Sequence, residues 1–134
     1  NLHTMLQKTD PTQTNSWKKL QNHYAQIKNL NIHDLFIADS KRFNEFSIKW
    51  QDFLFDYSKN HITPDTLQLF NALAKELQLQ ESIEAMFTGQ FINETEGRAV
   101  LHTALRNRKN TSVEVNGENV MPNINRVLKQ MKSF

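Results

Sequence analysis

The sequence predicts a mainly α-helical fold with one or two short β-hairpins. Apolar residues recur three and four positions apart over most of the 134-residue chain, which places them on one face of a helix. Two shorter stretches instead alternate apolar and polar residues, the pattern of a β-strand. Hydrophobic residues make up 38% and charged residues 22%, with a net charge of +2. This composition indicates a globular chain with a hydrophobic core and excludes a disordered one.

The first predicted helix lies near the N-terminus. Residues 1–11 are mostly polar and are predicted to be flexible. A helix is then predicted within residues 14–29, and Asn15 or Ser16 could cap its start. Its apolar face would consist of Trp17, Leu20, Tyr24 and Ile27.

A short helix and a hairpin are predicted next. The helix lies near residues 33–38 and would bury Leu35 and Phe36. Apolar and polar residues then alternate over residues 46–50 and again over 53–57, with a polar pair between the two runs. This pattern predicts a hairpin whose turn lacks glycine. We expect its aromatic residues to fill part of the core.

Two further helices are predicted over residues 64–77 and 80–87. Thr63 is a good N-cap for the first, and Pro64 suits the first helical position. Gly89 would end the second. The buried residues of the first helix are expected to be Leu67, Phe70, Leu73, Ala74 and Leu77. Those of the second are expected to be Ile83, Met86 and Phe87.

The C-terminal third is predicted to hold a helix, a hairpin and a last helix. Residues 95–106 form the predicted helix, and residues 113–120 form a hairpin with Asn116 and Gly117 in its turn. Pro122 opens the last helix. The sequence contains no stop signal before Phe134, which favours a truncated amphipathic helix. Its apolar face would be Ile124, Val127, Leu128 and Met131.

Several chemistries are excluded by residue content. The chain has no cysteine, so it can form neither disulfides nor thiolate metal sites. Its three glycines are too far apart for a phosphate-binding glycine loop. The histidines follow no metal-binding spacing, so no metal site is expected. The basic run at residues 106–109 lacks interleaved aromatics, so we expect no nucleic-acid partner, and no apolar run is long enough to predict a membrane span.

Residues 91–106 read F-I-N-E-T-E-G-R-A-V-L-H-T-A-L-R. This segment resembles the glucose-6-phosphate isomerase family, whose pattern is I-N-x-T-E-x-R-A-V-L-H-x-A-L-R, and it fits every fixed position. Residues 56–60 look like the family's D-Y-S-K-N motif. Shorter similarities lie at Leu35-Phe36, Arg42-Phe43, Phe46-Ser47 and Val120-Met121-Pro122. The resemblance runs from about residue 12 to residue 134.

The resemblance implies a cytoplasmic enzyme that interconverts glucose 6-phosphate and fructose 6-phosphate in glycolysis and gluconeogenesis, without a cofactor. It implies an α/β parent with sandwich domains of the sugar-isomerase type, whose N-terminal helical portion would be residues 12–134. The family is usually a homodimer. We therefore expect this chain to pack against the remainder of the large domain and the second subunit, and only the parent to bind hexose 6-phosphate.

The resemblance assigns no catalytic, cofactor-binding or metal-ligating residue to this chain. In the family, a glutamate base, a histidine, a lysine and Ser/Thr hydroxyls carry the chemistry, and all lie downstream of the matched region. We therefore expect an inactive N-terminal fragment. The alternative is a free-standing helical interaction module, which would need a complete core and a capped last helix.

Two clusters leave their roles open. Arg98, His102 and Arg106 are four apart, so on a helix they would share one face that meets a phosphate, an acidic patch or only solvent. We expect Arg98 to have an anionic partner, with Glu94 and Asp56 as the candidates. Residues 56–60 could bind a ligand, although such clusters more often fix a turn through side-chain hydrogen bonds to the backbone.

Overall fold

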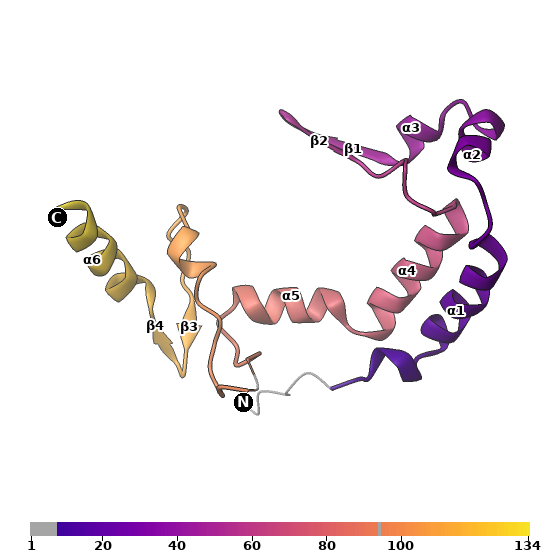
Figure 1. Ribbon diagram of the computed structural model, residues 1–134. Helices are drawn as coiled ribbons and strands as arrows, with labels where there is room; N and C mark the ends of the chain where they lie inside the picture. The colour runs from indigo at the N-terminus through magenta and orange to yellow at the C-terminus, as the bar shows by residue number, and fades with distance from the viewer. Residues whose placement is uncertain (1–7, 94) are drawn as a thin grey trace. The chain divides into compact units, whose positions relative to one another are not determined.

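The computed structural model describes residues 8–93 and 95–134 and confirms a mainly α-helical fold with two short hairpins (Figure 1). The chain divides into two compact units. Asp10–Leu77 form the first unit, and Gln78–Phe134 belong to the second. Part of the predicted flexible N-terminus, residues 1–7, lies outside the described residues. Pro11, the last residue of the segment predicted to be flexible, instead begins a 3₁₀-helix, η1 (Pro11–Gln13), which Asp10 caps.

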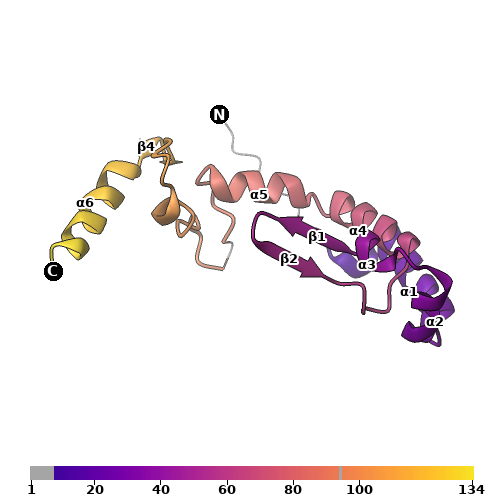
Figure 2. The same ribbon diagram turned by 90° about the horizontal axis from the view of Figure 1, so that it is seen from above.

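The first unit is built on two antiparallel helices, α1 (Asn15–Ile27) and α4 (Pro64–Glu76), which run side by side in Figures 1 and 2. The start of α1 contacts the end of α4, because the Ser16 hydroxyl donates to Glu76 Oε1 at 2.6 Å. Further along, His23 Nε2 lies 2.7 Å from the Thr66 hydroxyl near the start of α4. The predicted cap Thr63 and first-turn Pro64 are confirmed.

The caps and buried faces of these helices differ from the prediction. Thr14, and neither Asn15 nor Ser16, caps α1, because its hydroxyl accepts from the Trp17 N–H. The fully buried positions are the polar Ser16 and Thr66, whereas Tyr24 on the predicted apolar face is 65% exposed. Phe70 on α4 is also exposed. Polar contacts therefore join this helix pair toward both of its ends.

Helix α2 (Ile32–Ala38) confirms the predicted short helix, although Leu35 and Phe36 are only half-buried. A single helical turn, α3 (Arg42–Glu45), follows and was not predicted. It leads into the predicted hairpin, formed by β1 (Ser47–Trp50) and β2 (Phe53–Asp56).

The β1–β2 hairpin corrects one expectation. Its register pairs Ile48 with Phe55 and Trp50 with Phe53, which places these four side chains on one face. All four are exposed, Phe53 at 68%. The prediction that the aromatic residues of this region fill a core is therefore wrong for Trp50, Phe53 and Phe55, whereas it holds for Phe46, which is 2% exposed. Gln51 takes a φ of 51° in the turn and so supplies the left-handed residue that the sequence lacks as a glycine.

The second unit begins with α5 (Leu79–Phe87). Gly89 follows it with a φ of 81°, and the Gln90 N–H donates to the Ala85 carbonyl, which is the predicted glycine ending. Of the three residues expected to point inward, Ile83 and Phe87 are exposed and Met86 is half-buried, whereas the fully buried residue of α5 is Ala85, which was not predicted. The Asn-Gly hairpin is confirmed as β3 (Glu114–Val115) and β4 (Glu118–Asn119).

The predicted helix over residues 95–106 does not form. Asn93 and Arg98 pair as an isolated antiparallel bridge, and Gly97 takes a φ of 59° in the turn between them. Only Ala104–Arg106 become helical, as the 3₁₀-helix η2. Glycine is a weak helix former and supplies the left-handed residue of this turn, so local backbone preference overrides the apolar spacing.

A small core lies in the second unit, where Ala104, Val113 and Met121 pack together. The last helix, α6 (Met121–Lys132), supplies Met121 to this core from its first turn. At Ser133 the N–H still donates to the Lys129 carbonyl as in a helix, and the hydroxyl donates to the Gln130 carbonyl. The truncation of this helix stays a prediction. Among the described residues, no helix is long and apolar enough to cross a membrane.

Candidate functional site

The described residues of the family-like segment 91–106 are mostly without regular structure, and Val115 of the β3–β4 hairpin lines the same hollow as several of them. After α5 ends, the chain reaches the Asn93–Arg98 bridge, turns at Gly97 and continues without regular structure until η2. Gly89 allows this arrangement, because a Cβ there would lie 2.5 Å from the Glu114 carbonyl oxygen. Only glycine permits both this close approach and the positive φ.

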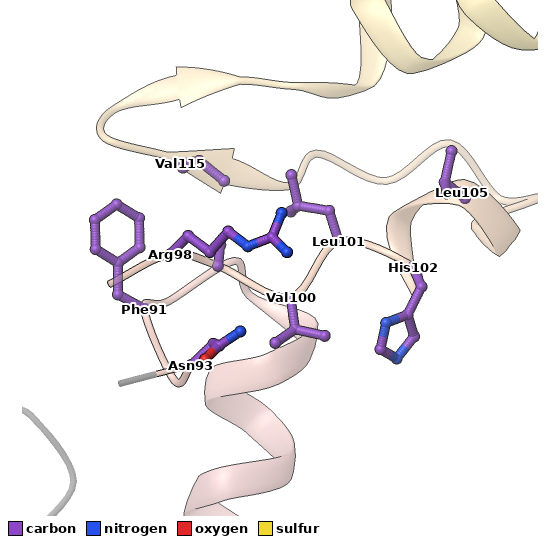
Figure 3. Close-up of a pocket in the computed structure, with 9 residues that line it drawn as sticks. Phe91, Asn93, Arg98, Val100, Leu101, His102, Leu105 and Val115 are labelled. Carbon is purple, nitrogen blue, oxygen red and sulfur yellow. The ribbon is translucent and has the colours of Figure 1, made fainter. Parts of the chain in front are cut away.

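An open hollow of about 550 Å³ lies along this segment. Its lining residues come from the irregular chain between α5 and η2, from Leu105 of η2 and from Val115 of β3 (Figure 3). They are Phe91, Asn93, Arg98, Ala99, Val100, Leu101, His102, Leu105 and Val115. The walls are mainly apolar, with one guanidinium and one imidazole among them, as expected for a site that binds mixed apolar and anionic groups.

The guanidinium of Arg98 in the lining of this hollow is paired with the carboxylate of Glu96. Arg98 Nε donates to Glu96 Oε2 in a short ion pair, and Asn93 Nδ2 donates to the same oxygen at 3.1 Å. The Glu96 N–H in turn donates to Asn93 Oδ1. Arg98 therefore has the anionic partner that was expected, but it is Glu96. The Arg98 side chain is 69% exposed, so this ion pair contributes little stability.

The three predicted cations do not share one helix face. Arg98 and His102 both line the hollow, whereas Arg106 belongs to η2 and donates from its guanidinium to the His102 carbonyl at 3.0 Å. Residues that are four positions apart share a face only in a helix, and this segment does not form one. The sequence did not single out Asn93 and Glu96 as partners, since their contact depends on the turn at Gly97.

A second polar cluster lies in the first unit, in the loop after β2. Asp56 Oδ1 accepts from both the Ser58 hydroxyl, at 2.6 Å, and the Ser58 N–H. These two hydrogen bonds, the hydroxyl first, hold the pKa of the Asp56 carboxyl below its usual value. Residues 56–60 therefore fix a turn, which is the structural one of the two interpretations that the sequence left open.

Arg42 is the residue that sequence reasoning missed. Its guanidinium is 3% exposed and donates to the carbonyls of Ser58, Asn60 and Ile62 at 2.8 to 3.0 Å. It also lies over the Phe46 ring, 4.5 Å from the ring centroid. Two of its three carbonyl acceptors, Ser58 and Asn60, belong to the D-Y-S-K-N motif, and the third, Ile62, follows it. No local sequence pattern indicates such a contact, because its partners lie 16 to 20 residues further along the chain.

The segment that lines the hollow and the polar cluster at residues 56–60 both fall within the range that a family model matches. The model of the phosphoglucose isomerase family matches residues 56–134. The chain belongs to the phosphoglucose isomerase family. The match begins at the first residue of the D-Y-S-K-N motif and includes the whole segment that lines the hollow. The recognition made from residues 91–106 is therefore confirmed.

Membership of the phosphoglucose isomerase family does not assign chemistry to individual residues here. The residues that line the hollow include no carboxylate that could act as the base of an isomerase. The resemblance over residues 12–55 lies outside the matched range and stays a prediction. What the family membership supports is an isomerase-related protein.

Proposed function

We propose that this chain is the N-terminal helical portion of an enzyme that interconverts glucose 6-phosphate and fructose 6-phosphate. The phosphoglucose isomerase match over residues 56–134 carries this proposal. The reaction belongs to glycolysis and gluconeogenesis, and we place it in the cytoplasm, as the family resemblance implies.

We further propose that the 134-residue chain is inactive by itself. Aldose–ketose isomerisation moves a proton between two neighbouring carbons, so it needs a base beside the sugar. Among the described residues, the lining of the hollow offers Arg98 and His102 but no carboxylate. The family resemblance implies that the glutamate base and its histidine and lysine partners lie downstream of this chain's matched region.

The partners in this proposal are the remainder of the large domain and the second subunit of a homodimer. Large apolar side chains are exposed in both units, more than a monomeric globular chain normally leaves bare. Those more than 60% exposed in β1, β2, α2 and α6 are Ile37, Trp50, Phe53, Phe55 and Met131. Such surfaces are expected where further protein covers the chain.

The test is an isomerase assay coupled to NADP reduction. The 134-residue chain alone should give no turnover above background, with a complete family enzyme as positive control. Co-expression with the remainder of a family enzyme, lacking the region equivalent to residues 1–134, should restore turnover. Activity of the chain alone would contradict the placement of the catalytic groups. Failure to restore activity, with both parts expressed and soluble, would favour a free-standing interaction module.

A further inference from the structure

The turn between β3 and β4 consists of an Asn-Gly pair. Asn116 and Gly117 have positive φ angles of 55° and 80°, and the strand residues on either side of them pair with each other. Two positive φ angles in a hairpin turn are typical of a type I′ turn. Asn116 is the only asparagine of the sequence that a glycine follows. Its carboxamide therefore lies next to a backbone nitrogen that no Cβ shields.

The side chain of Asn116 is free to rotate toward this nitrogen. Asn116 and Gly117 are both exposed, and a Cβ added to the glycine would meet nothing within 4 Å. Within residues 8–93 and 95–134, the Asn116 side chain forms no hydrogen bond. Two nearby asparagines differ, because Asn110 Oδ1 accepts a hydrogen bond from α6 and Asn119 Oδ1 accepts one from the Met121 N–H.

Asn110 is a close match for Asn116 within the same unit. It is also exposed, and its φ of 53° is nearly the same. The residue that follows it is Thr111, whose branched side chain crowds the backbone nitrogen. The chain therefore holds two left-handed, exposed asparagines that differ in the residue that comes next.

We propose that Asn116 is a self-modification site, at which the backbone nitrogen of Gly117 attacks the side-chain carboxamide. A bond forms between this nitrogen and Asn116 Cγ, and the bond from Cγ to Nδ2 breaks. The nitrogen gives up its proton to solvent and the departing amide gains one, so ammonia leaves and a succinimide remains. Water then opens the ring, at Cγ to give aspartate or at the main-chain carbonyl carbon to give isoaspartate. Water is the only co-reactant, and no atom is oxidised or reduced.

The turn must open before the ring can close. The planar ring includes the bond from Cα to the carbonyl carbon of Asn116, and this bond must rotate away from the angle of a type I′ turn. The hairpin is short, since its ladder pairs Glu114 with Asn119 and Val115 with Glu118. An isolated pair of such short strands opens at a low cost in free energy. The folded chain should therefore react at a rate that hairpin opening sets.

Isoaspartate would change one wall of the hollow. Its main chain runs through Cβ, so the turn gains an atom and no longer fits the pairing of Val115 with Glu118. Val115 lines the hollow (Figure 3), and the buried Val113 lies just before β3. Aspartate would keep the backbone and add only a negative charge beside Glu118. The two products therefore separate a change of backbone from a change of charge.

The experiment is incubation of the folded chain in mildly alkaline buffer, followed by proteolysis and mass spectrometry of the peptides. Heavy-oxygen water marks each converted residue, and an isoaspartyl methyltransferase labels isoaspartate. The same chain in urea gives the rate without the turn. Asn116→Gln is the matched control, because its longer side chain would have to close a larger ring. Asn116→Asp supplies the charge alone.

We expect Asn116 to convert at least roughly tenfold faster than Asn110, because the nitrogen that follows it carries no side chain beside it. The folded chain should convert more slowly than the chain in urea, and Asn116→Gln should not convert. The Val120 N–H donates to the Val113 carbonyl across the hairpin. Hydrogen exchange of this amide should be roughly tenfold faster in the isoaspartate fraction than in Asn116→Asp.

Three results would contradict the proposal, and none of them bears on the proposed function. Equal conversion of Asn110 would remove the special role of the Asn-Gly pair. Conversion in urea without conversion in the folded chain would mean that the turn stays closed. Equal exchange of the Val120 amide in the isoaspartate fraction and in Asn116→Asp would exclude the effect on the hairpin and the hollow.

Discussion

The two units of this chain bury different kinds of side chain. Among the described residues, the buried polar side chains all lie in Asp10–Leu77; they are Thr14, Ser16, Arg42, Ser58 and Thr66. The buried apolar side chains lie in Gln78–Phe134, apart from Phe46 in the first unit; they are Ala85, Ala99, Ala104, Val113 and Met121. One unit is therefore organised around hydrogen bonds and the other around a small apolar cluster.

The difference teaches how each unit specifies its geometry. A buried polar group must find a partner, so each one fixes a particular contact. Within the described residues, every buried side-chain nitrogen and oxygen has a hydrogen-bond partner. The apolar cluster of the second unit requires matched volume rather than matched atoms. The first unit should therefore be sensitive to loss of single hydrogen-bonding groups, and the second to loss of volume.

Arg42→Ala tests the polar unit and should have the largest effect. It leaves three carbonyls without their buried donor and removes the stacking on Phe46, which we expect to cost about 4 kcal/mol of unfolding free energy. Both tryptophans, Trp17 and Trp50, lie in this unit, so urea unfolding followed by Trp fluorescence reports it selectively. Arg42→Lys should recover only part of the loss, because an ammonium cannot span all three acceptors. An unchanged midpoint would contradict the anchoring role.

Met121→Ala tests the apolar unit. It removes the largest side chain of the Ala104–Val113–Met121 cluster and leaves a cavity, with an expected cost of about 3 kcal/mol. Hydrogen exchange of amides in η2, β3 and α6 should accelerate. The Trp fluorescence transition should move little if the units are independent. If hydrogen exchange and the Trp fluorescence transition shifted together, the two units would unfold as one, which would contradict their separate organisation.

Gly89→Ala should lower stability by about 2 kcal/mol, because the new Cβ meets the Glu114 carbonyl and the positive φ is strained. The loss should appear in the amides of α5 and β3 by hydrogen exchange. Gly117→Ala is the matched control, since a Cβ there meets nothing within 4 Å and the φ is similar at 80°. An equal loss in both variants would attribute the effect to backbone strain alone.

Acid should act on the first unit through Asp56. Its pKa is lowered in the folded chain by the Ser58 hydroxyl and then the Ser58 N–H, so its stabilisation is present above the unfolded value of 3.8. The contribution is lost as pH falls through the lower folded pKa. Asp10, whose pKa Thr12 lowers, acts in the same direction. Fluorescence titration of Asp56→Asn should show a weaker acid dependence, and an identical titration would exclude this mechanism.

Trp50→Ser with Phe55→Ser should have the smallest effect on folding. Both side chains are exposed, at 64% and 65%, so unfolding free energy should change by about 0.5 kcal/mol or less. Self-association measured by analytical ultracentrifugation should fall, because apolar surface is removed. A large loss of stability would instead show that the hairpin face is covered within the chain, contrary to the comparison.

Local sequence signals predicted most of the elements. Thr63-Pro64, Gly89 and Asn116-Gly117 marked a helix start, a helix end and a hairpin turn where the structure has them. These signals act within a few residues, through caps and positive φ angles, and so they can be read without knowledge of the fold. The family segment was recognised in the same way, from adjacent residues.

The sequence mispredicted where the spacing of residues alone was taken to indicate a helix or a buried face. The spacing of Arg98, His102 and Arg106 indicated a helix face, yet the turn at Gly97 and the bridge to Asn93 replaced the helix. The candidate site changed with it, since Arg98 and His102 line the hollow and Arg106 does not. Apolar spacing also overestimated burial on α1 and the β1–β2 hairpin.

The sequence alone determined the family, the helical character and the positions of the main turns, because these depend on short-range backbone preferences. Only the tertiary structure decided that Arg42 holds the loop after β2, that Glu76 meets Ser16, and that the apolar face of α6 stays exposed at Leu128 and Met131. These features join residues far apart in the chain or depend on which surfaces come together. Local backbone preferences do not determine such long-range contacts.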